Sequence, residues 1–193
     1  FMTKSAKYIL WFKEISIKDV PLVGGKNASL GEMFSKLTKK GVNVPDGFAL
    51  TAKAYWYFLK ENNLDSALRN IFSKFNPKSI KNLQETGKAA RREISDAQFP
   101  EKLKKEIIKA YRKLEIKYGK NTSVAVRTSG VAEDRPNASF AGQFETYLNV
   151  SGEDALLAAI KKCVVSTFTD RAIAYREEKK ISQLKFALSV GVQ

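Results

Sequence analysis

Two glycine-bearing segments, far apart in this 193-residue chain, constrain its fold more than any other feature. The first reads VGGKNASLGEM and contains Lys26, and the second runs from Val124 to Val150 and contains Arg127. In each segment a basic side chain lies beside glycine-containing backbone, which can approach a ligand closely because glycine has no Cβ. A shared anionic ligand explains this repeated arrangement, so we expect the fold to bring Lys26 and Arg127 into one cleft.

Composition excludes several classes of protein. Hydrophobic residues make up 44% of the chain and charged residues 28%, as in soluble globular domains. The sequence has no run of about 18 apolar residues, so no membrane span is expected. The single cysteine, Cys163, lies in an apolar helical context, which predicts a buried thiol and allows no disulfide within the chain. We therefore expect a cytoplasmic protein.

The formal net charge of +14 raises nucleic-acid binding as an alternative function. Only eight of the 34 basic residues are arginine, the side chain that most often reads and stacks on bases. Many lysines lie on the outer faces of predicted helices, interleaved with glutamates, so we interpret most of the charge as solvated surface and nucleic acid as an unfavoured partner. A basic module that binds anions or nucleic acid without turnover stays open as an alternative.

Hydrophobic periodicity predicts helices through much of the chain. Residues 26–40 carry apolar side chains at the i, i+3, i+4, i+7 spacing of one helix face, and Gly41 ends that helix. Thr51 can cap a further helix. We interpret about 52–118 as a helical insertion between the two glycine-bearing segments and expect it to form a lobe of its own. Further helices are predicted near 64–74, 79–97, 101–118, 154–168 and 170–180.

Short apolar, aromatic and β-branched runs predict four strands. In the last of them, Leu184, Phe186, Leu188 and Val190 alternate with other residues, and the given sequence ends soon after. We expect this strand to leave an apolar surface without its covering partner, which favours self-association at that truncated end. The predicted strands cover residues 8–12, 123–128, 144–150 and 184–190.

Lys26 follows two glycines and begins a helix, where unpaired N–H groups and the helix dipole favour an anion. A lysine ammonium adds a point charge suited to phosphate. The segment does not match the P-loop pattern G-x-x-x-x-G-K-[ST], so a P-loop NTPase is disfavoured. An ordinary helix preceded by a flexible turn is the alternative interpretation.

Arg127 follows the apolar run Val124–Val126, at what we expect to be the end of a strand. Its planar guanidinium can bind two phosphate oxygens at once. Gly142 can let backbone N–H groups reach a terminal phosphate, and Thr146 can add a hydroxyl. The alternatives are an ion pair of Arg127 with Glu133 or Asp134, and a plain hairpin turn around Gly142.

Two further runs, VPDGFALTA and FTDRAIAYR, accompany the glycine-bearing segments in order along essentially the whole chain. With VGGKNASLGEM and VAVRTSGVAEDRPNASFAGQFETYLNV, they resemble the N-terminal nucleotide-binding region of the phosphoenolpyruvate synthase family. Pyruvate phosphate dikinase and rifampin phosphotransferase share this arrangement. The resemblance implies an α+β fold for residues 1–193: the N-terminal lobe of an ATP-grasp-like domain, with a mixed sheet and the helical insertion.

The resemblance also assigns roles to four residues. Family positions matching Lys26 and Arg127 bind ATP phosphates, and those matching Gly142 and Thr146 lie on the glycine-rich loop over the phosphates. The chain departs from the family pattern at Thr128, usually Ser, and at Gly130-Val131, usually Ala-Thr. These departures remove one hydroxyl and leave both phosphate-binding cations in place.

The family's reaction needs parts that this sequence does not contain. Phosphoenolpyruvate synthases convert ATP, pyruvate and water to AMP, phosphoenolpyruvate and phosphate through a phosphohistidine, and this chain has no histidine. The resemblance places the second ATP-grasp half, with the adenine contacts and the Mg²⁺ ligands, the phosphohistidine domain and the pyruvate-binding barrel outside these residues. Glu133, Asp134 and Glu145 are metal-ligand candidates by type only.

The resemblance therefore implies an ATP-binding fragment of a phosphotransferase with paired acceptors, inactive by itself. A fragment of a rifampin phosphotransferase-like enzyme is the alternative within this group.

Overall fold

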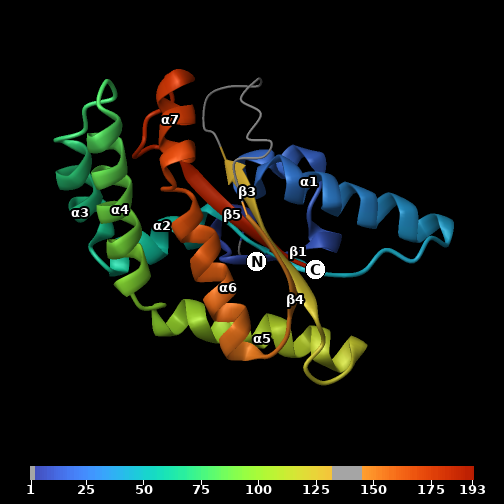
Figure 1. Cartoon of the computed structure of the whole chain (residues 1–193). Coiled ribbons are helices and arrows are strands. Elements are labelled where there is room, and N and C mark those ends of the chain that lie inside the picture. The colour runs from blue at the N-terminus through green and yellow to red at the C-terminus, as the bar shows by residue number, and fades with distance from the viewer. Residues whose placement is uncertain (1–2, 132–144) are drawn as a thin grey trace.

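The computed structural model describes residues 3–131 and 145–193, which form an α+β fold with one five-stranded sheet (Figure 1). The strands are β1 (Ile9–Trp11), β2 (Phe48–Leu50), β3 (Val124–Val131), β4 (Thr146–Val150) and β5 (Ala187–Val192). The helices are α1 (Val20–Leu37), α2 (Ala52–Glu61), α3 (Leu64–Phe72), α4 (Ile80–Asp96), α5 (Glu101–Tyr118), α6 (Glu153–Ser166) and α7 (Asp170–Glu178).

The sheet has the strand order β1-β2-β5-β3-β4, and each of its four pairings is antiparallel. The expectation of a mixed sheet is therefore wrong for the described residues. Strands β2 and β3 both run opposite to β5, so they point the same way, but β5 lies between them. Without β5, β2 and β3 would be parallel neighbours; with β5 between them, each forms an antiparallel pair with β5.

Helices cover the two faces of the sheet, because successive side chains of a strand point to opposite sides. On β2, Ala49 belongs to a small apolar cluster with α1 residues, whereas Phe48 and Leu50 belong to the larger core beneath the other helices. Helix α1 contacts β3 and β5, while α2 contacts β5 and α6 contacts β3. The sheet thus lies between α1 and most helices of the main core, as Figure 1 shows, although α1 also contacts α2.

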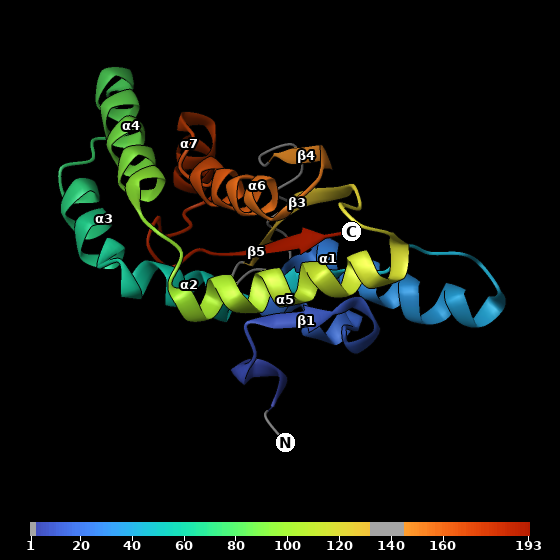
Figure 2. The ribbon, with the colours of Figure 1, turned by 90° about the horizontal axis from the view of Figure 1, so that it is seen from below.

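The predicted helical insertion is helical, but it does not form a separate lobe. One apolar core contains Phe58 of α2, Leu68 of α3, Ile94 of α4 and Ile107 of α5 together with residues of four strands. Seen from below, α5 lies across the molecule next to β1, which it contacts (Figure 2). Because their apolar faces are covered by the sheet and by α6, these helices share the core of the whole domain.

Strand β5 differs most from its prediction. It spans Ala187–Val192 instead of residues 184–190, and all six of its residues are buried. It pairs with β2 on one side and β3 on the other, so it is the central strand. The expectation of an uncovered apolar surface at this strand is therefore wrong. Self-association, which was predicted from that surface, stays an untested prediction. No helix among the described residues is long and apolar enough to span a membrane.

Candidate phosphate-binding site

Gly24 interrupts α1 and sets the position of the helix that follows. Its backbone is non-helical, with φ 72° and ψ 164°, so a regular helix begins again at Gly25. A Cβ at position 24 would overlap the Ser129 hydroxyl and lie 2.7 Å from the carbonyl oxygen of Gly130. The positive φ and the contact with β3 both require glycine here. The chain can thereby place the first turn of the helix, with Lys26, directly against the sheet.

Asn27 attaches this helix start to the sheet through two hydrogen bonds of its own, and a third bond extends the link to a neighbouring strand. Its side chain is fully buried, and its backbone N–H donates to Ser129 Oγ at 3.3 Å. Its Nδ2 donates to Ser189 Oγ at 2.9 Å, and that hydroxyl donates to the carbonyl oxygen of Leu50 at 2.6 Å. Helix α1 is thus linked to β3, β5 and β2 just beneath Lys26.

Lys26 and Arg127 line one open hollow of about 370 Å³ on the α1 side of the sheet. The prediction that the fold brings these two cations together, although they are distant in sequence, is confirmed. Both segments meet here because Gly24 and Asn27 place α1 over β3. The remaining lining residues are Gly25, Ser29, Leu30 and Met33.

Neither cation has an acidic partner among the described residues. Lys26 is exposed and Arg127 is half-buried. The Nε of Arg127 is buried and makes no hydrogen bond to any described residue. Glu133 and Asp134, the alternative ion-pair partners of Arg127, lie outside the described residues. Two cations that have no acidic partner in residues 3–131 and 145–193, beside an open hollow, can attract an anion that touches both.

The sequence suggested that Arg127 lies at the end of its strand, and this prediction is wrong. Strand β3 continues through Val131, because residues 128–131 keep pairing with β5. Arg127 lies mid-strand, opposite Gly191 on β5 and opposite Thr146 on β4. Opposed residues of an antiparallel pair project from the same face.

The exposed Thr146 is therefore on the same face of the sheet as Arg127. Gly142, the fourth predicted site residue, lies outside the described residues. Glu145 is described and exposed; its carbonyl oxygen accepts a hydrogen bond from the N–H of Thr128 at 3.4 Å. In the described residues, no three or more Asp, Glu, Cys or His side chains gather in a way that could hold a metal ion.

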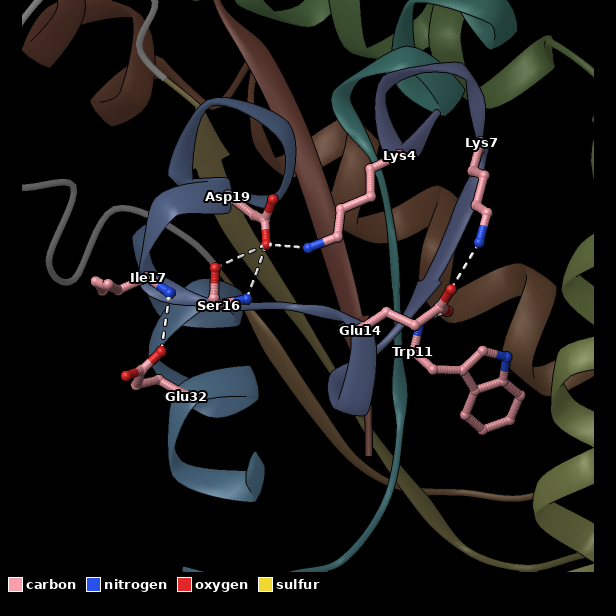
Figure 3. A network of polar contacts seen from close by, with 8 residues as sticks. All are labelled: Lys4, Lys7, Trp11, Glu14, Ser16, Ile17, Asp19 and Glu32. Atoms are coloured by element: carbon pink, nitrogen blue, oxygen red, sulfur yellow. Dashed lines mark hydrogen bonds and ion pairs between the residues drawn. The ribbon is translucent and has the colours of Figure 1, made fainter. Parts of the chain in front are cut away.

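A network of polar contacts in front of α1 holds the segment that leads into it (Figure 3). Asp19 accepts hydrogen bonds from the Ser16 backbone N–H at 2.8 Å and from Lys4 Nζ at 2.9 Å. Burial alone would raise the pKa of Asp19, but the bonds from Lys4 and Ser16 outweigh it and lower that pKa. Glu32 of α1 accepts from the Ile17 N–H at 3.2 Å. The helix bearing Lys26 is thus fixed on both sides of the Gly24 turn.

A larger hollow, of about 660 Å³, lies between β1 and α5, away from both glycine-bearing segments. Lysines line it, but so do acidic side chains, and two ion pairs form at its edge: Lys7 with Glu14 at 2.6 Å and Lys117 with Asp46 at 3.3 Å. Its positive charge is therefore partly neutralised. The smaller hollow, whose two cations are unpaired within the described chain, is the better anion site.

Sequence reasoning missed the residues that hold the two cations in place. Asn27, Ser129, Ser189 and Gly191 were not singled out. One signal was available: Asn27 follows Val23 by four residues and precedes Gly31 by four, so it occupies the buried stripe of the helix. A polar residue on such a stripe must find hydrogen-bond partners, and here they come from the strands below.

The chain was compared with known proteins. A family model described as pyruvate phosphate dikinase, AMP/ATP-binding domain, matches residues 20–193. The phosphoenolpyruvate synthase of Synechocystis sp. is 50% identical over 195 residues, covering 98% of this chain and 24% of that protein. The enzymes of Aquifex aeolicus and Escherichia coli are 49% and 43% identical, each over 98% of this chain and over 22% and 24% of their own lengths.

This chain thus spans about a quarter of the length of these relatives. The family match includes both glycine-bearing segments and nearly all of the fold. The chain belongs to the pyruvate phosphate dikinase AMP/ATP-binding domain family.

Proposed function

We propose that this chain binds the phosphates of ATP in the hollow between the start of α1 and strand β3. The observation that carries the proposal is the meeting of Lys26 and Arg127 in one hollow, with no carboxylate partner for either among the described residues. Membership of an AMP/ATP-binding domain family supports the choice of a nucleotide as the anion.

The two cations suit different parts of a polyphosphate. The Arg127 guanidinium can hold two oxygens of one phosphate in its plane, whereas the Lys26 ammonium acts as a point charge that can follow another phosphate. Thr146, opposite Arg127, can offer a hydroxyl donor from the neighbouring strand. Gly142 is proposed to bring backbone N–H groups to the same phosphates.

We further propose that the parent protein is a phosphoenolpyruvate synthase with an ATP-grasp arrangement. It would convert ATP, pyruvate and water to AMP, phosphoenolpyruvate and phosphate, a cytoplasmic step in gluconeogenesis. The three relatives named above, all phosphoenolpyruvate synthases, support this assignment. Because this chain has no histidine, the phosphohistidine must come from another part of such a parent.

Mg²⁺ would neutralise charge on the transferring phosphoryl group. We propose that its carboxylate ligands also come from the part of the parent that this chain does not cover. Lys26 and Arg127 would then position the phosphates and stabilise the charge that develops on them, without taking part in covalent chemistry.

Calorimetric titration of this chain with ATP tests the binding proposal. We expect weak binding, with a dissociation constant well above micromolar, because only the phosphate contacts are present. Lys26→Ala and Arg127→Ala should each weaken it about tenfold or more, since a charge-assisted hydrogen bond contributes about 1.5–3 kcal/mol. Lys40→Ala and Arg92→Ala, which change exposed cations elsewhere, are matched controls. Equal affinity in all four variants would refute the site.

A basic binding module without turnover is the competing function, supported by the net charge of +14. Such a module would bind random DNA with an affinity that falls steeply with salt, because each neutralised phosphate releases counterions. Binding that is insensitive to Lys26→Ala and Arg127→Ala but steeply salt-dependent would favour it over the ATP site.

A further inference from the structure

We propose that Asn27 is a positioning residue that orients the guanidinium of Arg127 toward the hollow; this inference rests on the ATP-binding function proposed above. Two buried polar atoms of the described chain have no hydrogen-bond partner there and flank the same glycine. One is the acceptor Oδ1 of Asn27, and the other is the donor Nε of Arg127. Their common neighbour is Gly191 of β5.

The sheet register places the two residues that carry these atoms on either side of Gly191. Gly191 is the cross-strand partner of Arg127, and a Cβ at position 191 would overlap Asn27 Oδ1. Opposed Cβ atoms in an antiparallel pair are about 4.5–5.5 Å apart. Asn27 Oδ1 therefore occupies the place of a residue-191 side chain, beside the stem of Arg127, and only a glycine leaves room for it.

The orientation of the Asn27 amide follows from its other hydrogen bond. The Ser189 hydroxyl donates its only proton to the carbonyl oxygen of Leu50, so toward Asn27 it can only accept. The NH₂ group of Asn27 must therefore point at Ser189, and Oδ1 must point the opposite way, toward Gly191 and Arg127. The carbonyl of Leu50 therefore fixes which group donates in each bond: Ser189 donates to Leu50, and Asn27 donates to Ser189.

The Arg127 Nε–H needs an acceptor because arginine stays protonated and its buried donor is otherwise unsatisfied. We infer that Asn27 Oδ1 accepts it, either directly after a side-chain rotation or through one bridging water. A guanidinium held at Nε keeps both terminal nitrogens free in a fixed plane. These are the two donors that bind a phosphate in a bidentate manner.

The Arg127 Nε–H resonance in NMR spectra of the ligand-free chain tests the inference. The resonance is identified by its loss in Arg127→Lys; the chain has only eight arginines, so the spectrum is simple. We expect this proton to exchange with water at least tenfold more slowly than that of Arg92, whose side chain is 81% exposed. Equal exchange at the two arginines would overturn the proposal without any variant that must fold.

Two variants, Asn27→Leu and Asn27→Asp, then test whether Asn27 orients the Arg127 guanidinium or only fills space beneath the helix. Leucine removes both polar atoms, so the Nε–H should lose its protection and ATP affinity should fall several-fold. Aspartate keeps the acceptor but loses the donor to Ser189, so the chain should become less stable while the Nε–H stays protected. If Asn27 only supports the fold, the two variants will show the same Nε–H exchange, and this result would overturn the proposal.

Failure of the Asn27 inference can be distinguished from failure of the proposed ATP-binding function. The exchange measurement needs no nucleotide, whereas the ATP site is tested by Lys26→Ala and Arg127→Ala. If neither of those variants weakens ATP binding, the proposed function is refuted, while slow exchange abolished by Asn27→Leu would still support the orienting contact.

Discussion

Arg176 provides the sharpest test of the energetics of this fold. It is fully buried, and its guanidinium lies between the rings of Phe168 and Phe186, at 5.4 and 5.2 Å from their centroids. Its Nε donates to Gln183 Oε1 at 2.7 Å, but Nη1 and Nη2 have no hydrogen-bond partner within the described chain. Among the described residues this charge is held by aromatic faces and one amide, without a carboxylate.

The opposing contributions can be estimated. Burial lowers the pKa of Arg176 well below its ordinary value, to about 10, with a smaller opposing influence of Tyr55. Such a change corresponds to an unfavourable free energy on the order of 3 kcal/mol for keeping the charge in the folded state. Two desolvated cation–π contacts offset it by roughly 1–2 kcal/mol each. The net contribution of the charge to stability is therefore close to zero.

Replacing Arg176 by methionine should consequently change the free energy of unfolding by no more than about 1 kcal/mol. It removes the desolvation penalty and the cation–π compensation together, and the freed amide of the half-buried Gln183 can bond to water instead. Arg176→Lys keeps the charge but loses the planar stacking and the bond to Gln183, so it should cost about 2–4 kcal/mol. Urea unfolding followed by the fluorescence of Trp11 and Trp56 measures both. A loss above about 3 kcal/mol for methionine, or a smaller loss for lysine than for methionine, would refute this reasoning.

Three further predictions follow from the site and its supports. Gly191→Ala should lower the urea midpoint strongly because its Cβ would overlap Asn27 Oδ1, whereas Gly25→Ala, with nothing within 4 Å, should barely change it; equal effects would contradict the close approach. Because the pKa of Asp19 is lowered by folding, its contribution to stability is present above its ordinary pKa of 3.8 and is lost as pH falls through the lower folded value. Urea midpoints from pH 6 to pH 2 should therefore decline less in Asp19→Asn, and parallel curves would argue against that contribution. Incubated with ATP, Mg²⁺ and pyruvate, this chain should release no AMP above a buffer control; AMP formation that Arg127→Ala abolishes would contradict the idea that it is only part of the catalytic unit.

Local patterns predicted the helices well, because their signals lie within one helix. The side chain of Thr51 does cap α2 by accepting from the N–H of Ala54, and Gly41 ends the first helical stretch with φ 81°. In α5 the sequence places apolar side chains along one stripe: Leu103, Ile107, Tyr111, Leu114 and Tyr118. All are buried except Tyr118, whose hydroxyl accepts a hydrogen bond from the Asp46 N–H. Polar tips of aromatic side chains are the usual exceptions to such stripes.

The order of the strands, and the buried residues that hold Lys26 and Arg127 in place, could not be predicted in the same way. The apolar run in β5 is equally compatible with an edge or a central position, and only pairing with the distant β2 and β3 decides between them. The meeting of Lys26 and Arg127 was predictable because two glycine-bearing segments needed a common partner. The role proposed for Asn27 was not, because it depends on Ser129, Ser189 and Gly191, which become neighbours only when the sheet has formed.

The central place of β5 has a consequence for how this domain is made in the cell. Strand β3 has β4 on its other side, but β2 and β3 face each other across a gap that, in the part of the chain the structure describes, Ala187–Val192 fill. During synthesis, two strand edges must therefore wait, unpaired, until the last of the five strands has left the ribosome. Unpaired edges are the usual starting points of aggregation. Both the closed sheet and the Asn27 contact to Ser189 thus require this last strand, which unites residues far apart in the sequence.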